Sequence, residues 1–286
     1  MENSKLVSCI ITTYNRPNLV GRAIESVLNQ SYKNIEIILV DDHSSESYAP
    51  VIEKYKNDPR LTYSRNSRNL RLSASRNVGI GLAKGEFIAF LDDDDTWLPS
   101  KLQKQVSFLN NNSEYVACTS THIESVSKET STAFKTNIYL EDNLGFNHLG
   151  PPSKILVRKE IATVTSFDTN SNHAEDWDFY LRILTHGPIH VFEEPLIIYD
   201  TVHFGRMTTG FSTLSIGEIK EKANMTIKNK ELIGESNFKM RMASYYLSGF
   251  FKRKGKMSHL YKVQREVGLT TVLKSLFKKL KKGVSK

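Results

Sequence analysis

Hydrophobic residues follow two alternating patterns along the first 200 positions. Short continuous apolar runs, which predict buried strands, are separated by stretches in which apolar residues return every three or four positions, as on one face of a helix. The predicted strands cover residues 6–13, 35–40, 61–64, 86–92, 115–120, 153–157, 189–192 and 196–199. The predicted helices cover residues 17–30, 48–56, 72–84, 99–111 and 177–185.

Strands that alternate with helices predict an α/β fold with a mostly parallel central sheet flanked by helices. Residues 122–148 are polar and poorly patterned, so they predict a loop or a small excursion. Beyond residue 215 the pattern is helical to the end. We therefore expect an α/β domain over residues 1–210 and a helical C-terminal extension over residues 211–286.

Four consecutive aspartates at residues 92–95 directly follow the predicted strand 86–92. Adjacent carboxylates repel one another and cannot be buried without compensation. A hard divalent cation with oxygen ligands would compensate them. Asp92 and Asp94 stand at i and i+2, so in an extended segment they share a face. A solvated acidic turn is the alternative, but a run that ends a buried strand favours a site.

Asp41 and Asp42 form a second acidic pair at the end of strand 35–40. The carboxyl ends of parallel strands lie along one edge of a sheet, where open α/β sheets place their ligands. Both acidic clusters are therefore expected in one site.

Glu175 and Asp176 stand at the start of a predicted helix. Acidic residues are common there because they cap the helix and interact with its dipole. Beside a metal-binding ligand site, however, such a carboxylate is a candidate general base. His173 and His203 are possible ligands or acid–base groups, although a lone histidine is more often structural.

The composition is that of a globular protein of 286 residues, with 39% hydrophobic and 24% charged residues. No apolar run approaches the roughly 20 residues that span a bilayer. The first residues lead directly into a strand, which predicts no signal peptide. Cys9 and Cys118 lie in separate apolar runs without metal-ligand spacing, which predicts buried free thiols in a reducing compartment.

Basic charge is concentrated at the C-terminus. Residues 252–286 hold 12 Lys and Arg residues against one acid, so their net charge of +11 leaves the preceding residues at −3. Apolar residues at helical spacing form a stripe within this basic segment. They are Leu269, Val272, Leu273, Leu276, Phe277 and Leu280. The pattern predicts an amphipathic helix on an anionic membrane surface, with a helix packed on the catalytic domain as the alternative. Nucleic acid is not an expected partner, because the aromatic residues needed for base stacking are not interleaved.

Two further motifs suggest other kinds of site. Gly79, Gly81 and Gly85 lie in and at the end of a helical pattern, which argues against a phosphate-binding loop. Asp92-x-Asp94-x-Thr96 also fits the Mg²⁺-dependent phosphatases of the haloacid dehalogenase family, in which the first Asp is a nucleophile. That motif usually follows the first strand of its fold, whereas three strand–helix units precede it here.

Five ordered blocks within about residues 5–205 resemble family 2 glycosyltransferases with the GT-A (Rossmann-like) fold. The blocks lie at residues 7–16, 38–44, 73–80, 90–97 and, taken together, 150–153 with 175–177. Their order makes the resemblance far more specific than any single block.

The resemblance implies roles for individual residues. Tyr14 would lie against a uracil ring, an Asp of the Asp41–Asp42 pair would accept its N–H, and Arg76 would help to position the nucleotide. Asp92 would contact ribose or the metal's water shell, and Asp176, or less favourably Glu175, would be the general base. Nucleotide-sugar binding would also involve Thr12, Arg16 and Asp93. The implied ligands of Mn²⁺ or Mg²⁺ are Asp94, Asp95 and His203.

The implied activity is inverting transfer of one hexose, forming a β-linkage, from a UDP-sugar such as UDP-glucose or UDP-galactose. Asp200 stands where relatives often have Arg, which leaves the role of His203 open. The motif of processive synthases is absent, which favours a single addition. The expected acceptor is a polyprenyl-diphosphate-linked sugar, as in bacterial O-antigen or capsule assembly. We expect a cytoplasmic protein, peripheral on the inner face of the cell membrane. A membrane-associated nucleotide-binding module without turnover is the non-enzymatic alternative.

Overall fold

The computed structural model describes residues 4–170, 173–202, 214–250 and 255–284, with the side chains after residue 277 left out. Its strands are β1 (Val7–Thr13), β2 (Ile35–Asp41), β3 (Leu61–Arg65), β4 (Phe87–Asp92), β5 (Thr96–Trp97), β6 (Ala117–Glu124), β7 (Asn137–Ile138), β8 (Leu156–Arg158) and β9 (Ile189–Tyr199). The helices before residue 200 are α1 (Pro17–Leu28), α2 (Ala49–Tyr55), α3 (Arg71–Leu82), α4 (Lys101–Asn111), α5 (Leu140–Asn143), the 3₁₀ turn η1 (Pro152–Lys154), α6 (Lys159–Thr165) and α7 (Glu175–Leu184).

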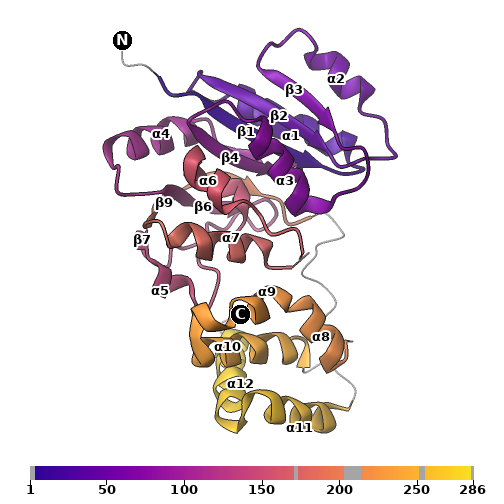
Figure 1. The fold of residues 1–286 in the computed structure, drawn as a ribbon, viewed down its shortest axis with the longest axis vertical. Helices are drawn as coiled ribbons and strands as arrows, with labels where there is room; N and C mark the ends of the chain where they lie inside the picture. Colours follow the sequence, from indigo (N-terminus) through magenta and orange to yellow (C-terminus); the bar gives the residue numbers. More distant parts are fainter. Residues whose placement is uncertain (1–3, 171–172, 203–213, 251–254, 285–286) are drawn as a thin grey trace.

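The strands form one central sheet in the order β3-β2-β1-β4-β8-β6-β9-β5, with β7 paired to β9. The first four strands of this order are parallel, as the strand–helix alternation predicts. Beyond them the sheet is mixed: β8 is antiparallel to both β4 and β6, whereas β6 and β9 are parallel. The predicted α/β class, with helices flanking a central sheet, is confirmed (Figure 1).

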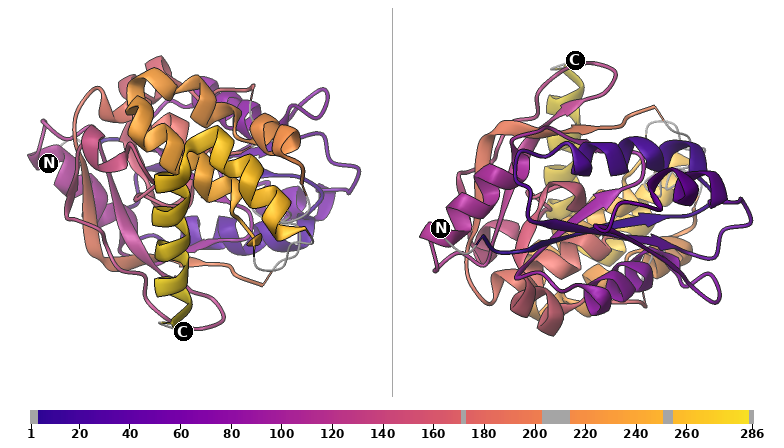
Figure 2. Two further views of the ribbon diagram at one scale, coloured as in Figure 1. Left: turned by 90° about the horizontal axis from the view of Figure 1, so that it is seen from below. Right: turned by 90° about the horizontal axis from the view of Figure 1, so that it is seen from above.

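Side chains from alternate positions of the inner strands fill two hydrophobic cores, one on each face of the sheet. In β1, Cys9 and Ile11 pack toward α1 and α4, while Ile10 packs toward α3 and α6. The view from above in Figure 2 shows helices on both faces of the strands. Cys9 and Cys118 are buried free thiols, as expected. Because both faces are covered, the strands are continuous apolar runs and not alternating ones.

Two details of the predicted strands differ. The strands predicted at 189–192 and 196–199 are one strand, β9, because a shift in its register with β6 near Thr121 accommodates the extra residues. The strand predicted from residue 153 begins at Leu156, because Pro152 starts a 3₁₀ turn instead. Proline fixes its own φ and cannot donate to a strand ladder.

The C-terminal region is helical, as predicted, and has a hydrophobic core of its own. Its helices are α8 (Ile216–Lys222), α9 (Asn224–Lys228), α10 (Lys230–Tyr246, kinked at Gly234), α11 (Lys256–Val267) and α12 (Leu269–Val284). Tyr246, Val263 and Val272, from α10, α11 and α12, meet in this core. Figure 1 shows these helices beneath α7. The predicted boundary at residue 210 lies outside the described residues.

Helix α12 divides the predicted apolar stripe between two environments. Val272 is buried and Leu276 packs beside it, in the core shared with α10 and α11. Leu269, Leu273 and Phe277 are 53%, 57% and 61% exposed. One flank of the stripe is therefore packed against other helices, and the neighbouring flank faces solvent.

Gly79 and Gly81 lie on different sides of α3, and only Gly79 is packed closely against the sheet. A Cβ added at Gly79 would lie 2.4 Å from Ile10 Cγ2, whereas one at Gly81 would meet nothing within 4 Å. We expect Gly79→Ala to destabilise the fold by about 1–3 kcal/mol through overpacking. The matched variant Gly81→Ala should stabilise it by up to about 1 kcal/mol, because Ala favours a helix. Urea unfolding measures both; equal effects would contradict this packing.

Candidate active site

A cavity of about 530 Å³ lies at the carboxyl edge of the parallel strands. The sheet register brings the strand ends together, since Thr12 pairs with Asp92 and Thr13 pairs with Asp41. Most of the residues predicted for the site line this cavity. They are Thr12, Tyr14, Arg16, Asp42, Arg76, Asp92, Asp93, Asp94, Glu175 and Asp176.

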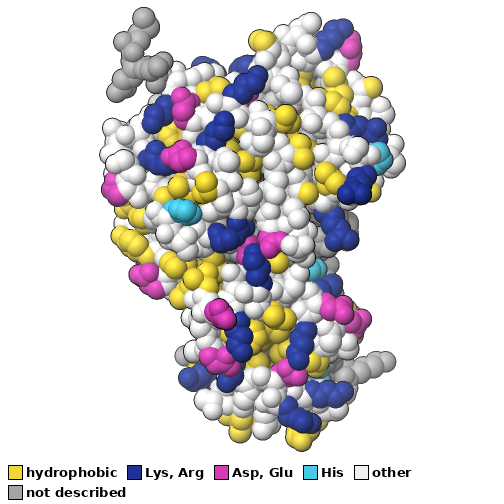
Figure 3. All heavy atoms as spheres, in the orientation of Figure 1, with side chains coloured by type: hydrophobic (Ala, Val, Ile, Leu, Met, Phe, Trp, Pro, Cys, Tyr) yellow, Lys and Arg dark blue, Asp and Glu magenta, His cyan; other side chains and the backbone are white. Residues whose placement is uncertain are grey.

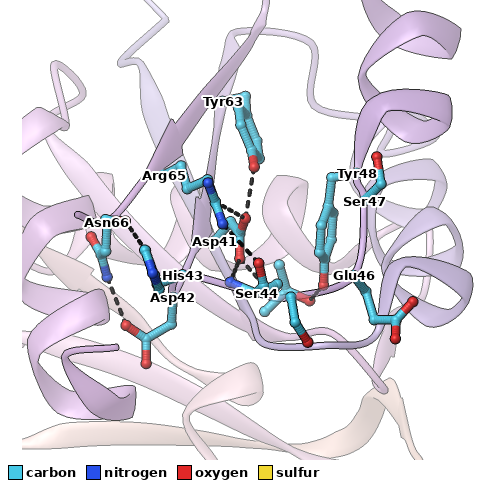
Figure 4. A network of polar contacts seen from close by, with 12 residues as sticks. Asp41, Asp42, His43, Ser44, Glu46, Ser47, Tyr48, Tyr63, Arg65 and Asn66 are labelled. Atoms are coloured by element: carbon cyan, nitrogen blue, oxygen red, sulfur yellow. Dashed lines mark hydrogen bonds and ion pairs between the residues drawn. The ribbon is translucent and has the colours of Figure 1, made fainter. Parts of the chain in front are cut away.

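Asp41 is not among the cavity-lining residues. Its Oδ1 accepts hydrogen bonds from the backbone N–H (2.9 Å) and the hydroxyl of Ser44. Its Oδ2 accepts one from Tyr63 Oη (2.7 Å) and pairs with Arg65 Nε (3.3 Å). All of its acceptor positions are therefore used within the protein, and Figure 4 shows its carboxylate pointing away from that of Asp42. The sequence predicted that either Asp41 or Asp42 accepts a ligand's N–H. Of the two, Asp42 is the one that lines the cavity.

Asp42 lines the cavity and organises the start of α3. Its Oδ1 accepts from Asn66 Nδ2 (2.9 Å) and from the backbone N–H of Leu70 (2.7 Å). Its Oδ2 accepts from the backbone N–H of Arg71 (2.8 Å). A carboxylate offers about four acceptor positions, so Asp42 keeps one for a ligand's N–H donor.

Asp93 is a buried acid whose pKa burial raises to about 6. Thr13 Oγ1 donates to its Oδ2 (2.7 Å), and Arg16 Nη1 donates to its Oδ1 (3.1 Å). The same Arg16 nitrogen also donates to Asp94 Oδ2 (3.1 Å). Arg16 thus joins the loop after β1 to the acidic run.

Asp94 lines the cavity together with Asp92. Burial and the nearby negative charge of Asp92 raise the pKa of Asp94, although the Arg16 guanidinium opposes this. A second positive charge at this position would relieve the repulsion, and two carboxylates suit a hard divalent cation. No group of three or more His, Cys, Asp or Glu side chains arranged for a metal occurs within the described residues. A divalent cation held by Asp92 and Asp94 would take its remaining ligands from a bound substrate and water.

Asp95 does not join this pair. It is only 1% exposed, it does not line the cavity, and its Oδ1 accepts from the backbone N–H of Asp200 (2.9 Å). Its Oδ1 thereby fastens the chain after β9 to the acidic run, and its position outside the cavity lining does not support the predicted role as a metal ligand. His203 lies outside the described residues.

Arg76 is a buried cation that joins two walls of the cavity. Its Nη2 donates to Asp92 Oδ1 (2.7 Å), and its Nη1 donates to Glu175 Oε1 (3.3 Å). Its guanidinium also lies over the ring of Phe167, 5.1 Å from the centroid. Glu175 is thereby engaged in an ion pair, which makes it the weaker candidate for a general base.

Asp176 is the other acid at the start of α7. Burial, with the charge of Glu175, raises its pKa to about 7, against the opposing effects of the Trp177 N–H and the cations Arg76 and Arg241. Its Oδ2 accepts from Asn147 Nδ2 (2.8 Å). A carboxylate with a pKa near neutrality in a cavity is suited to accept a proton.

The sequence model of the family described as "Glycosyl transferase family 2" matches residues 8–167, which is more than half of the chain. The chain belongs to glycosyl transferase family 2. The family match and the α/β fold confirm the predicted GT-A transferase enzyme. They leave the phosphatase and the non-catalytic module without support.

Curated relatives of this glycosyltransferase align either over most of the chain or over less than half of it. Glycosyltransferase MJ1057 of Methanocaldococcus jannaschii is 30% identical over 206 residues, covering 68% of this chain and 70% of that protein. The Escherichia coli UDP-Glc:alpha-D-GlcNAc-diphosphoundecaprenol beta-1,3-glucosyltransferase WfaP is 38% identical over 120 residues. That alignment covers 42% of this chain and 47% of WfaP.

Among solved structures, residues 1–349 of Staphylococcus aureus TarS in complex with UDP-GlcNAc share the fold of this glycosyltransferase. The TM-score is 0.70 at 17% sequence identity, over 91% of this chain and 81% of that one. The likeness therefore extends beyond residue 167 into the helical region. Within the described residues of this glycosyltransferase, no helix is both long and apolar enough to cross a bilayer.

The C-terminal helices support α7 from the side away from the sheet. Arg241 of α10 stacks on Trp177, with its guanidinium carbon 3.4 Å from the ring centroid, and donates to the carbonyl of Gly145 (3.2 Å). The fully buried Asp178 accepts from Asn229 Nδ2 (2.7 Å) and pairs with Lys228. The helix that carries Asp176 is therefore held by both parts of the protein.

Asn147, Arg71 and Arg241 are residues at or near the site that the sequence pattern did not reveal. Asn147 lies in the poorly patterned stretch 122–148, and its side-chain oxygen accepts from two backbone N–H groups, those of Leu149 and Gly150. This fixes its amide so that Nδ2 faces Asp176. In the sequence, only the Pro-Pro turn at residues 151–152 indicates an ordered backbone near Asn147.

Replacing Asp176 by asparagine should stabilise the protein at alkaline pH. The folded-state pKa is raised, so the stability contributed by the protonated acid is complete below about pH 4 and is lost as pH rises through about 7. We expect Asp176→Asn to raise the unfolding free energy by roughly 1–3 kcal/mol at pH 8, and by much less near pH 4.

Urea unfolding at several pH values measures this difference. Asp58→Asn is the control, because Arg60 lowers the pKa of Asp58 and its loss should destabilise the fold at neutral pH. A gain for Asp176→Asn that does not grow with pH would contradict the raised pKa.

Proposed function

We propose that this glycosyltransferase moves one hexose from a UDP-sugar to a lipid-diphosphate-linked sugar, with inversion at the anomeric carbon. The observation that carries the proposal is the placement of three groups around one cavity: Asp42, the Asp92–Asp94 pair, and Asp176. Asp42 suits a nucleobase, the Asp92–Asp94 pair suits a metal-bound diphosphate, and Asp176 suits an acceptor hydroxyl.

The uracil ring is proposed to bind between Tyr14 and Asp42. Tyr14 lines the cavity and is 48% exposed, so its ring face is available for stacking. Asp42 would use its remaining acceptor position for the uracil N–H. The binding of UDP and UDP-GlcNAc by the structurally similar TarS supports a uridine nucleotide here. Thr12 would line the nucleotide site beside Asp92.

Asp94, with Asp92, is proposed to hold Mn²⁺ or Mg²⁺ against the diphosphate. When bound, the ion would offset the charge on the departing UDP as a Lewis acid. Arg16 and Asp93 would keep Asp94 in position through the contacts described above. Arg76 would act through Asp92, whose carboxylate it orients toward the cavity.

Asp176 is proposed as the general base. Its raised pKa lets it take the proton of the acceptor hydroxyl while that oxygen bonds to the anomeric carbon. The bond between the anomeric carbon and the UDP oxygen breaks in the same displacement. Attack on the face opposite UDP inverts the configuration, so an α-linked donor gives a β-linked product. Asn147 would hold the carboxylate toward the cavity.

The acceptor class is proposed from the names of relatives, and O-antigen assembly is the process that we propose for it. The name of WfaP specifies glucosyl transfer from UDP-glucose to a sugar on diphosphoundecaprenol with a β-linkage. A second relative, 45% identical over 107 residues, is a putative colanic acid glycosyl transferase of Escherichia coli. UDP-glucose or UDP-galactose is the proposed donor, and the name of WfaP supports the first of these.

Such an acceptor would be met at the inner face of the cell membrane, so we place this glycosyltransferase there as a peripheral protein. Leu269, Leu273 and Phe277 project from α12, on which Lys274 is exposed, and further lysines follow in the sequence. Over the C-terminal helices, Figure 3 shows Lys and Arg side chains beside hydrophobic ones, with some Asp and Glu among them. Apolar side chains with flanking cations suit insertion among anionic lipid headgroups.

Calorimetric titration of UDP, with and without Mn²⁺, tests the donor site. Wild-type protein should bind UDP more tightly with Mn²⁺, and Asp94→Ala should lose this gain of about tenfold or more. Asp176→Asn should bind UDP within about twofold of wild type, yet lose turnover of UDP-glucose by about 10²–10⁴. Absence of UDP binding by the wild type under either condition would refute the proposal.

Sedimentation with vesicles tests the membrane surface. Vesicles rich in phosphatidylglycerol should carry the protein down, and the double change Leu273→Ser with Phe277→Ser should weaken binding roughly tenfold or more. Val164→Ser is the matched control, because Val164 is 70% exposed on α6 in the α/β part. Equal sedimentation of the double variant and wild type would contradict the assignment of α12 as the membrane surface.

A further inference from the structure

Arg71 begins α3 in a backbone conformation that is unfavourable for it. Its φ is +71°, in the left-handed region where a side chain with a Cβ is strained. The conformation is held by Asp42, whose two oxygens accept from the backbone N–H groups of Leu70 and Arg71. Strain of this kind persists where the surroundings enforce it, and it is concentrated at ligand sites.

The Arg71 side chain is exposed and lines the same cavity as Asp42. Its guanidinium makes no hydrogen bond or ion pair with any residue of the described ranges. By contrast, Arg76 and Arg16, which also line the cavity, both bind carboxylates. A guanidinium has five N–H donors and no acceptor, so Arg71 offers the cavity an unused set of donors.

We propose that Arg71 recognises the base of the nucleotide by donating a hydrogen bond to the uracil carbonyl oxygen O4. This rests on the proposed uridine donor. Uracil presents an N–H flanked by two carbonyl oxygens, and Asp42 has one acceptor position left for that N–H. Arg71 follows the turn that Asp42 holds, and both side chains line the cavity, so one ligand can meet the acceptor of Asp42 and the donors of Arg71. An adjacent acceptor and donor match the uracil edge.

Cytosine would be disfavoured by the same two residues. It carries a lone pair in place of the uracil N–H, which would face the carboxylate of Asp42. It also carries an amino group in place of one carbonyl, which would face the donors of Arg71. The pair therefore selects uracil over cytosine, because a mismatched polar group at a hydrogen-bonding site is left unpaired.

The sheet separates Arg71 from the proposed diphosphate position. Asp42 follows β2, Asp92 ends β4, and β1 lies between these strands. Neighbouring strands are about 4.8 Å apart, so the two strand ends are separated by roughly 10 Å. The backbone of Arg71 is held on the β2 side by Asp42, which is the side proposed for the base.

Calorimetry of wild type and Arg71→Ala with UDP, uridine and CDP tests the proposal. We expect Arg71→Ala to weaken UDP and uridine binding by the same factor, about tenfold or more, because a charged hydrogen bond is lost. CDP binding should change less, so the preference for UDP over CDP should fall. Arg68→Ala is the matched control, because Arg68 is exposed in the same loop and does not line the cavity.

Three outcomes would overturn the inference. Unchanged UDP binding by Arg71→Ala, or a loss seen with UDP but not with uridine, would exclude contact with the base while leaving the proposed donor intact. Equal losses for UDP and CDP would exclude base selection. Failure of the wild type to bind UDP would instead remove the proposed function together with this inference.

Arg71→Gly separates strain from binding. It should lose UDP affinity as Arg71→Ala does, yet melt roughly 2–4 °C higher than Arg71→Ala, because glycine adopts a positive φ without strain. Equal melting temperatures of the two variants would contradict the strained geometry from which Arg71 is placed.

Discussion

The buried guanidinium of Arg76, bonded to Asp92 on one side and to Glu175 on the other, is the interaction on which the rest of the site depends. A cation that is 2% exposed must be paired, because an isolated buried charge is far too costly. The pairing brings the end of β4 and the start of α7 into one cavity, although the two acids are more than 80 positions apart in the sequence.

The same pairing separates acids that look alike in the sequence. Glu175 is neutralised by Arg76, whereas Asp176, one residue later, meets Asn147 and has a raised pKa. Asp41 and Asp42 differ in the same way, since one has all its acceptor positions filled by neighbours and the other keeps one for the cavity. In each pair, the local hydrogen bonds decide which carboxylate is available to a ligand.

The C-terminal helices belong to this arrangement and are more than an appendage. Their own core makes them a rigid support, and Arg241 and Asn229 fasten them to the far side of α7. A helix whose first turn carries the proposed base is thereby fixed from both sides. The C-terminal helices thus help to position the first turn of α7.

The sequence alone determined the α/β class, the order of the first strands and helices, and the edge at which the acidic clusters meet. These follow from local periodicity and from the rule that parallel strands end at one edge. It could not determine that Asp95 and Asp41 turn away from the cavity, nor find Asn147, Arg71 and Arg241. Those depend on hydrogen bonds and packing between segments far apart in the chain. Only the tertiary structure brings those segments together, because pattern and propensity act over a few residues.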